Sequence, residues 1–133
     1  FYGLAGIRLG AVLAPLPLLK VIARRLGTWP VSGAALEIGA RAYADTDWEK
    51  ETRRALSHAA CELDTALKSV GLSWIAGTDL FRLVEMEDAH SVFYRLANAG
   101  VYVRRFDWSK THLRIGLPAT SQAQERLLNA LTP

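Results

Sequence analysis

The chain has 133 residues, half of them hydrophobic (50%), and a formal net charge of +3. A chain this apolar and this weakly charged can build a core and does not resemble a disordered segment. Its 16 lysines and arginines are scattered, with no basic run interleaved with aromatic residues, which argues against nucleic acid as a partner. The single cysteine, Cys61, excludes an intrachain disulfide framework and a cysteine-based zinc cluster.

The chain shows no sign of a membrane segment. No uncharged run is longer than 11 residues, and one of that length, between Arg8 and Lys20, contains Pro15 and Pro17. A membrane-spanning helix needs ~20 apolar residues, and the run also lacks the order of features of a signal peptide. We therefore expect a soluble, cytoplasmic protein without a membrane partner, in which Cys61 is a reduced, partly buried thiol. Because the chain begins with Phe and holds one Met, we expect a fragment or a processed chain.

The first part of the chain predicts one strand and two helices. Residues Ile7 to Ala14 are short, apolar and bounded by Gly and Pro, as in a buried strand. Leu16 to Leu26 follows as a helix with prolines near its first turn, where a missing N–H costs little. Ser32 is then a suitable N-cap for an Ala-rich helix that runs to about Ala44.

The clearest element is a long helix from Thr46 to Val70, which Gly71 ends. Thr46 and Glu49 form the pattern of a capping box, and the apolar residues that follow keep the helical period. A helix of this length spans about 36 Å and can bridge two domains. We therefore expect a domain boundary in its first turns, with residues 1–48 in one domain and residues 49–133 in another.

The remainder alternates strands and helices. Strands are expected at Leu72–Ile75, Leu80–Met86, Val101–Phe106 and His112–Gly116. Asp88 is expected to cap a helix that reaches about Asn98 before Gly100, and Ser121 and Gln124 to open a terminal helix ending near Leu131. The predicted fold class is therefore α/β, with a C-terminal α+β layer in which two or three helices cover a small sheet.

Few motifs that carry chemistry are present. The sequence holds no P-loop, CxxC, HExxH or GxSxG pattern. His58, Cys61 and Glu62 lie one turn apart on the long helix and could form a metal-binding face. A structural role is the favoured interpretation because Cys61 adjoins the apolar stripe, so no metal site is expected.

Three arginines, Arg8, Arg104 and Arg114, stand next to aliphatic residues in predicted strands. Since strand neighbours point to opposite faces, each arginine should point away from the core that its neighbours form. Arginine grips carboxylate or phosphate through two parallel hydrogen bonds, which makes all three candidates for anion binding. The alternative is an ordinary solvated face or an internal salt bridge.

Residues 1–10 (FYGLAGIRLG) change the balance between these interpretations. They resemble the stretch that follows the cofactor-binding lysine in fold-type I enzymes of the aminotransferase class I/II family, which use pyridoxal 5'-phosphate (PLP). The resemblance implies that this lysine immediately precedes Phe1. It also implies that Arg8 binds the phosphate of the cofactor.

The resemblance extends over essentially the whole chain. The segment around Trp29–Ser32 resembles threonine-phosphate decarboxylases and histidinol-phosphate aminotransferases, two branches of this family. Residues 100–104 (GVYVR) and 113–116 (LRIG) resemble two motifs whose arginines bind substrate. By this resemblance Arg104 binds the substrate phosphate and Arg114 the substrate carboxylate, although the two roles could be exchanged or share one anion. The segment 103–118 looks most like the decarboxylase branch.

The resemblance therefore implies a lyase that decarboxylates L-threonine O-3-phosphate to (R)-1-amino-2-propanol phosphate for cobalamin biosynthesis. Two alternatives are a histidinol-phosphate-type aminotransferase and a non-enzymatic α+β interaction module. Residues 1–48 would end the PLP-binding large domain and residues 49–133 would form the small C-terminal domain. The family implies a homodimer. This chain would carry no catalytic residue, would be inactive alone, and would expose apolar surface meant for the missing part.

Overall fold

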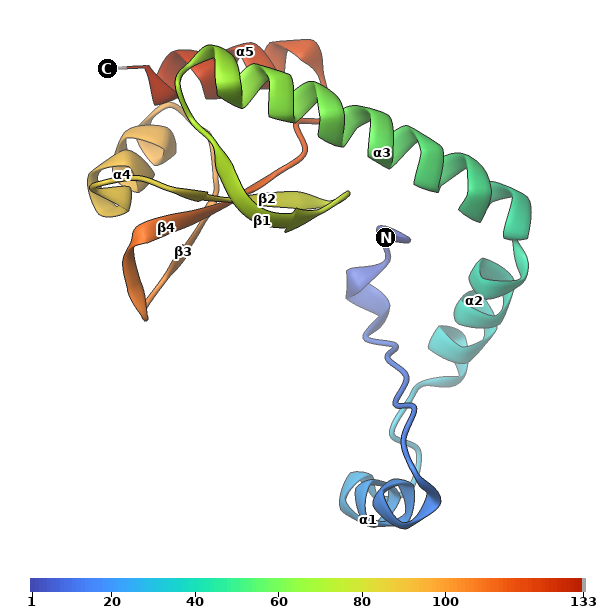
Figure 1. Ribbon diagram of the computed structural model, residues 1–133. Coiled ribbons are helices and arrows are strands. Elements are labelled where there is room, and N and C mark those ends of the chain that lie inside the picture. Colours follow the sequence, from blue (N-terminus) through green and yellow to red (C-terminus); the bar gives the residue numbers. More distant parts are fainter. Residues whose placement is uncertain (133) are drawn as a thin grey trace. The chain divides into compact units, whose positions relative to one another are not determined.

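The computed structural model describes residues 1–132. The chain divides into two units: the first spans Phe1–Glu49 and the second begins at Lys50 (Figure 1). Each unit is described by itself below. The assignment of the two segments to a cofactor-binding domain and a small domain stays a prediction. No helix among the described residues is both long enough and apolar enough to cross a membrane.

The first unit consists of a short 3-10 helix and two α-helices joined by extended segments. The 3-10 helix η1 is Ala5–Ile7, α1 is Leu16–Leu26 and α2 is Gly33–Ala44. Both α-helices confirm the sequence prediction. Ser32 caps α2 as expected, because its side chain accepts a hydrogen bond of 3.1 Å from the backbone N–H of Ala35.

The predicted strand Ile7–Ala14 is wrong. After η1, Arg8 has a φ of 54°, in the left-handed region, and the following residues are irregular. A strand is stable only when a neighbouring strand pairs with its backbone, and none of the described residues does so for this segment. The apolar composition of the segment therefore does not by itself produce a strand here.

The long helix is confirmed as α3, Thr46–Ser69. Its capping differs from the expectation, because Asp45 and not Thr46 accepts a hydrogen bond of 3.0 Å from the backbone N–H of Trp48. Gly71, with φ 75°, ends the helix, and the N–H of Leu72 closes the turn on the carbonyl of Leu67 at 3.0 Å. Cys61 on this helix is exposed, so the expectation of a partly buried thiol is wrong.

The second unit contains a four-stranded antiparallel sheet with the strand order β1-β2-β4-β3. Its strands are β1 (Trp74–Thr78), β2 (Phe81–Glu85), β3 (Arg104–Phe106) and β4 (Ser109–Gly116). All four strands were expected, although β1 begins two residues later than predicted, β3 is shorter and β4 begins earlier. The α+β layer is thus confirmed.

Two shorter helices complete this unit, α4 (Ala89–Asn98) and α5 (Ser121–Leu131). Asp88 caps α4 as predicted, accepting hydrogen bonds from the N–H groups of His90 and Ser91. The cap of α5 is one residue earlier than predicted, because the side chain of Thr120 accepts from the N–H of Ala123 at 3.1 Å. Both helices therefore begin at a residue whose side chain caps the first turn, and such capping residues can be recognised from the local sequence.

One face of the sheet packs against α3, α4 and α5 and forms the core (Figure 1). The strands contribute Val84, Leu113 and Ile115, each at most 1% exposed. The helices contribute residues from all three elements: Leu63, Leu67, Ala89, Leu96, Leu127, Ala130 and Leu131. Because side chains alternate along a strand, the residues between the buried ones point to the other face of the sheet.

A buried ion pair joins α3 to β2. Arg82 is 6% exposed, and its Nε and Nη2 atoms donate to Oδ1 and Oδ2 of Asp64 at 2.6 and 2.9 Å. The hydrogen bonds and charge of Arg82 lower the pKa of Asp64 below its usual value, and those of Asp64 raise the pKa of Arg82. The carboxylate is therefore more easily ionised in the folded chain than in the unfolded chain.

This shift predicts an acid-sensitive contribution to stability. A lowered folded-state pKa stabilises the fold above the unfolded pKa of about 4, and the contribution is lost as the pH falls through the folded pKa. Replacing one partner of a buried pair costs about 3 kcal/mol. Asp64→Ala should therefore lower the free energy of unfolding strongly at pH 7 and by progressively less as the pH falls below about 4. Urea denaturation at a series of pH values measures this; a loss that does not change with pH would contradict it.

Candidate anion-binding site

Arg104 and Arg114 both point away from the core, as the sequence predicted. Arg114 is exposed on β4 between Leu113 and Ile115, which are 0% and 1% exposed. Arg104 begins β3 and is exposed directly after Val103, which is 4% exposed. The alternation of side chains along each strand places both guanidinium groups on the face of the sheet opposite the helices.

The register of the sheet brings these two arginines together. Arg104 is the cross-strand partner of Arg114 in the antiparallel pair of β3 and β4. Directly opposite residues have Cβ atoms about 5 Å apart, on the same face. We call Arg104 and Arg114 the arginine pair. Like charges at such positions repel each other and are destabilising unless an anion lies between or beside them.

No acidic side chain among the described residues neutralises the arginine pair. Among residues 1–132, neither guanidinium forms an ion pair with a carboxylate. The guanidinium of Arg114 instead lies over the ring of Phe81, with 5.1 Å between the guanidinium carbon and the ring centroid. Its N–H donors lie in the plane of the group and remain available. The pair can therefore bind a phosphate, a carboxylate or a ligand that carries both.

His112 lies two residues before Arg114 and so on the same face of β4. Its Nδ1 is 2.6 Å from the hydroxyl of Ser109 and 3.0 Å from that of Thr111, so local hydroxyls hold the ring. The ring also contacts the indole of Trp108, with centroids 5.3 Å apart. His112 and its polar and aromatic contacts therefore lie beside the arginine pair, toward the β3–β4 turn.

Arg8 belongs to the first unit and is described apart from the arginine pair. It is exposed, and its Nη1 donates one hydrogen bond of 3.2 Å to the carbonyl of Ala5. No described carboxylate pairs with it, and a side chain at Gly6 or Gly10 would meet nothing within 4 Å. An exposed guanidinium beside open backbone, without a described acidic partner, keeps donors available for an anion, as the family resemblance leads us to expect for Arg8.

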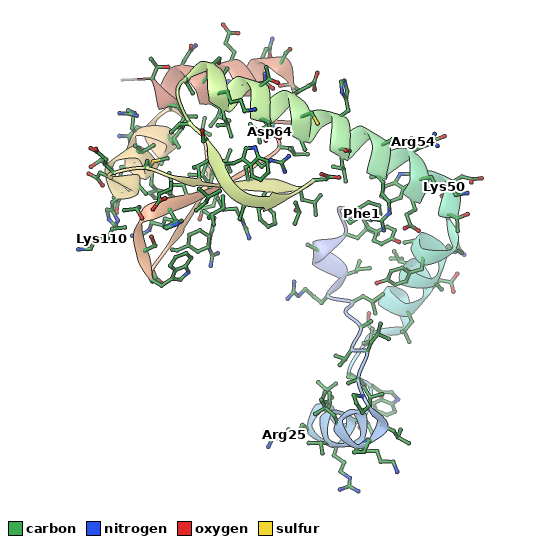
Figure 2. All side chains as sticks on the ribbon, viewed as in Figure 1. Phe1, Arg25, Lys50, Arg54, Asp64 and Lys110 are labelled. Atoms are coloured by element: carbon green, nitrogen blue, oxygen red, sulfur yellow. The ribbon has the colours of Figure 1, made fainter. Side chains whose placement is uncertain are left out.

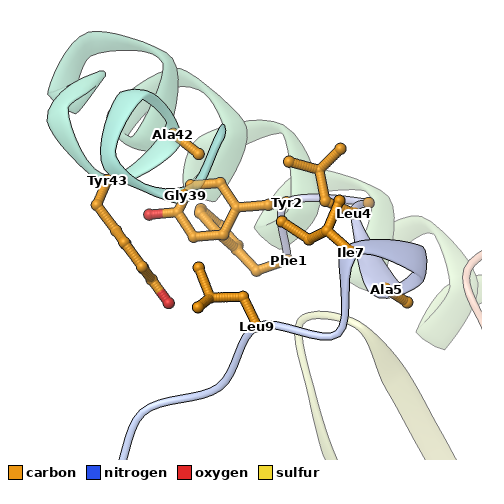
Figure 3. A pocket seen from close by; sticks show the side chains of 10 residues that line it. Phe1, Tyr2, Leu4, Ala5, Ile7, Leu9, Gly39, Ala42 and Tyr43 are labelled. Carbon is orange, nitrogen blue, oxygen red and sulfur yellow. The ribbon is translucent and has the colours of Figure 1, made fainter. Parts of the chain in front are cut away.

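The backbone around Arg8 is held by apolar contacts within the first unit. Figure 3 shows a pocket lined by the N-terminal residues and α2, into which the side chain of Leu9 reaches. A Cβ at Gly39 would overlap the Leu9 side chain in its present position, so a larger residue there would displace Leu9. Phe1 and Tyr2 add edge-on and stacked ring contacts with Trp48. The segment that carries Arg8 is therefore anchored on both sides by side-chain packing.

The metal-binding alternative for His58, Cys61 and Glu62 on α3 gathers too few ligands among the described residues. Nε2 of His58 lies 3.7 Å from Oε1 of Glu62, an exposed contact one turn apart. Among the described residues, no group of three or more His, Cys, Asp or Glu side chains could hold a metal ion. The interaction is that of an ordinary solvated helix surface.

Sequence reasoning missed Arg82. This arginine stands between Phe81 and Leu83, the same local pattern as Arg114, yet it is buried against Asp64. Because the carboxylate lies 18 residues earlier in the chain, no local signal reveals the pairing. Its cross-strand partner is Gly77, where a Cβ would collide with the backbone carbonyl of Phe81 and lie 3.0 Å from the Arg82 Cδ.

The fold is a mixed helix–sheet layer, and the arginine pair on its open face is a candidate site for anionic ligands. The family model for aminotransferase class I and II matches residues 1–131, and the chain belongs to this family. The chain is 42% identical to a threonine-phosphate decarboxylase from Sinorhizobium sp and 38% identical to one from Pseudomonas aeruginosa. Each of these alignments covers 98% of this chain and 39% of the relative.

Two further comparisons agree with this family. The chain is 33% identical to histidinol-phosphate aminotransferase 2 from Pseudomonas aeruginosa, over 98% of this chain and 36% of that relative. The chain also matches the solved structure of a protein from Burkholderia pseudomallei K96243, with a TM-score of 0.70 and 30% identity. That protein is described as an aminotransferase by inference. That match covers 98% of this chain and 41% of the solved chain. The chain thus spans well under half the length of these relatives.

The geometry of the arginine pair predicts that phosphate stabilises the protein. Binding to the folded state alone raises stability by RT ln(1 + [L]/Kd), about 1.4 kcal/mol at ten times Kd. Arg114→Gln should remove the rise in melting temperature that phosphate causes, compared with chloride at equal ionic strength. Lys110→Gln, which removes one exposed charge from the same hairpin, is the matched control and should keep the rise. An undiminished phosphate effect in Arg114→Gln would refute the site.

Proposed function

We propose that the chain is part of a PLP-dependent lyase that decarboxylates L-threonine O-3-phosphate to (R)-1-amino-2-propanol phosphate, for cobalamin biosynthesis. The observation that carries this proposal is the cross-strand arginine pair without carboxylate partners. The substrate has two anionic ends, a phosphate and a carboxylate, which suit two guanidinium groups. The relatives named threonine-phosphate decarboxylase, at 42% and 38% identity, support the same substrate.

In this proposal Arg8 binds the phosphate of the cofactor. Its exposed guanidinium has one hydrogen bond to a backbone carbonyl and no acidic partner, which leaves donors for an anion. When bound, PLP supplies an electron sink for the bond that breaks at the substrate's α-carbon. The residues described here contribute binding and orientation, and we propose that the catalytic lysine lies outside them.

The arginine pair would orient the substrate. Arg104 takes the phosphate and Arg114 the carboxylate, or the two exchange roles. A substrate gripped at both ends cannot rotate freely about the bonds between them, so the grip sets which bond at the α-carbon stands perpendicular to the cofactor plane. A decarboxylase requires the bond to the carboxylate there, and an aminotransferase the bond to hydrogen. Orientation of this kind can supply up to about 7–11 kcal/mol of the barrier.

A histidinol-phosphate-type aminotransferase is the second candidate. The 33% identity to the Pseudomonas aeruginosa relative favours it, and its substrate also carries a phosphate. Histidinol phosphate carries a phosphate and no carboxylate, so both arginines would bind the same phosphate group. The two candidates therefore differ in whether one or two anionic groups contact the pair.

We also propose that the full-length protein is a cytoplasmic homodimer and that the missing part covers the first unit. Large apolar side chains stand open in that unit: Leu13 is 99% exposed, Trp29 is 92% exposed, and α1 has no buried residue. Apolar surface of this extent marks a contact with other protein. The short chain alone would accordingly be prone to aggregate.

Activity assays on the full-length protein test the proposed reaction. We expect release of carbon dioxide from L-threonine O-3-phosphate, and no transamination of histidinol phosphate with 2-oxoglutarate. Transamination without carbon dioxide release would contradict the lyase proposal and support the aminotransferase instead. The absence of both activities in PLP-loaded protein would favour a non-enzymatic module.

Single substitutions in the full-length protein separate the cofactor role from the substrate role. Arg114→Ala should lower kcat/KM about a hundredfold, as expected from losing two charge-assisted hydrogen bonds, and leave PLP absorbance unchanged. Arg8→Ala should weaken PLP retention, measured as cofactor lost on dialysis. If Arg8→Ala held PLP as tightly as the parent, the cofactor assignment would be wrong.

A further inference from the structure

The ion pair between Asp64 and Arg82, which we call the clamp, lies on the core face of the sheet. Figure 2 shows Asp64 on the side of α3 that faces the strands. Two nitrogens of the guanidinium bind the two carboxylate oxygens at 2.6 and 2.9 Å, the bidentate arrangement that is strongest for these groups. The clamp therefore fixes the position of the Arg82 side chain relative to α3.

The third nitrogen of the guanidinium holds the β1–β2 turn. Nη1 of Arg82 donates to the carbonyl of Thr78 and, at 3.3 Å, to the carbonyl of Phe81. Thr78 and Phe81 are cross-strand partners on either side of this turn. Through Arg82, a carboxylate on α3 thus determines where the turn and the start of β2 lie.

The surroundings of Arg82 are shaped to admit this arrangement. Gly77 is its cross-strand partner, and a Cβ there would lie only 3.0 Å from the Arg82 Cδ. The ring of Trp74 covers the guanidinium, with 4.8 Å from the guanidinium carbon to the ring centroid. A buried ion pair stabilises little more than apolar residues of the same volume. Its distinct contribution here is therefore the hydrogen bonds to the turn.

Phe81 connects the clamp to the opposite face of the sheet. Its carbonyl accepts from Arg82, while its ring lies 5.1 Å from the guanidinium carbon of Arg114. In the register of β2 and β4, Phe81 pairs with Gly116 and Arg114 pairs with Leu83, so Phe81 and Arg114 are diagonal neighbours. A long side chain reaches such a diagonal partner. The Phe81 ring is thus a support that sets the direction of the Arg114 guanidinium.

We propose that Asp64 and Arg82 are positioning residues for Arg114, acting through the β1–β2 turn and the ring of Phe81. The inference rests on the proposed function, in which Arg114 binds the substrate. Loss of the clamp frees the turn, moves the Phe81 ring and leaves the Arg114 guanidinium without a fixed direction. Substrate binding weakens, whereas the cofactor contact at Arg8 does not involve the clamp.

The test uses Asp64→Asn in the full-length PLP-loaded protein, with two readouts. Nuclear magnetic resonance of labelled arginine reports the ring-current shift that Phe81 imposes on Arg114, and Phe81→Leu defines the value without it. Steady-state kinetics report KM and kcat for the phosphorylated amino acid. We expect Asp64→Asn to lose the ring-current shift and to lower kcat/KM about tenfold, with a share of the loss in kcat because Arg114 also orients the substrate, and with PLP absorbance nearly unchanged.

Two further variants separate positioning from folding. Glu62→Gln removes an exposed carboxylate from the same helix, where it contacts His58, and should leave both readouts as in the parent. Asp64→Glu keeps the charge and should retain most of the substrate affinity. An Arg114 resonance unmoved by Asp64→Asn overturns the positioning role. A moved resonance with both KM and kcat unchanged shows instead that Arg114 does not bind substrate, which overturns the proposed function.

Discussion

Arg104 and Arg114 face each other across β3 and β4 on the open side of the sheet, and no described carboxylate neutralises either. This arrangement persists because the other side of the sheet holds it in place. Leu113 and Ile115 are buried against the helices, so a slip of one residue would expose them and bury Arg114. The hydrophobic core therefore determines the position of the charges, and in our proposal an anionic ligand relieves their repulsion.

Local signals in the sequence account for most of the secondary structure. Ser32 and Asp88 cap their helices as predicted, and Gly71 ends the long helix with a left-handed turn. Alternation along β4 placed Arg114 on the solvent side, because its two neighbours are aliphatic. In each case the deciding interaction joins residues within a few positions of one another, and so it can be recognised from sequence alone.

The expectations that failed depend on partners far away in the chain or beyond it. The segment Ile7–Ala14 has the composition of a strand, but no described strand pairs with it. Arg82, like Arg114, stands between two hydrophobic residues in a strand. It is nevertheless buried, because Asp64 on α3 neutralises its charge. Arg104 and Arg114 lie opposite each other because of the register between β3 and β4. Motif resemblance indicated both arginines, but not that they are cross-strand partners.

The most direct measurement is a crystal structure of the full-length protein with PLP and a non-reactive analogue of L-threonine O-3-phosphate. We expect the guanidinium nitrogens of Arg104 and Arg114 to lie about 2.7–2.9 Å from oxygens of the analogue's phosphate and carboxylate. Both groups would then lie over the open face of the sheet, beside Phe81. An analogue bound with both arginines left in solvent would contradict the account.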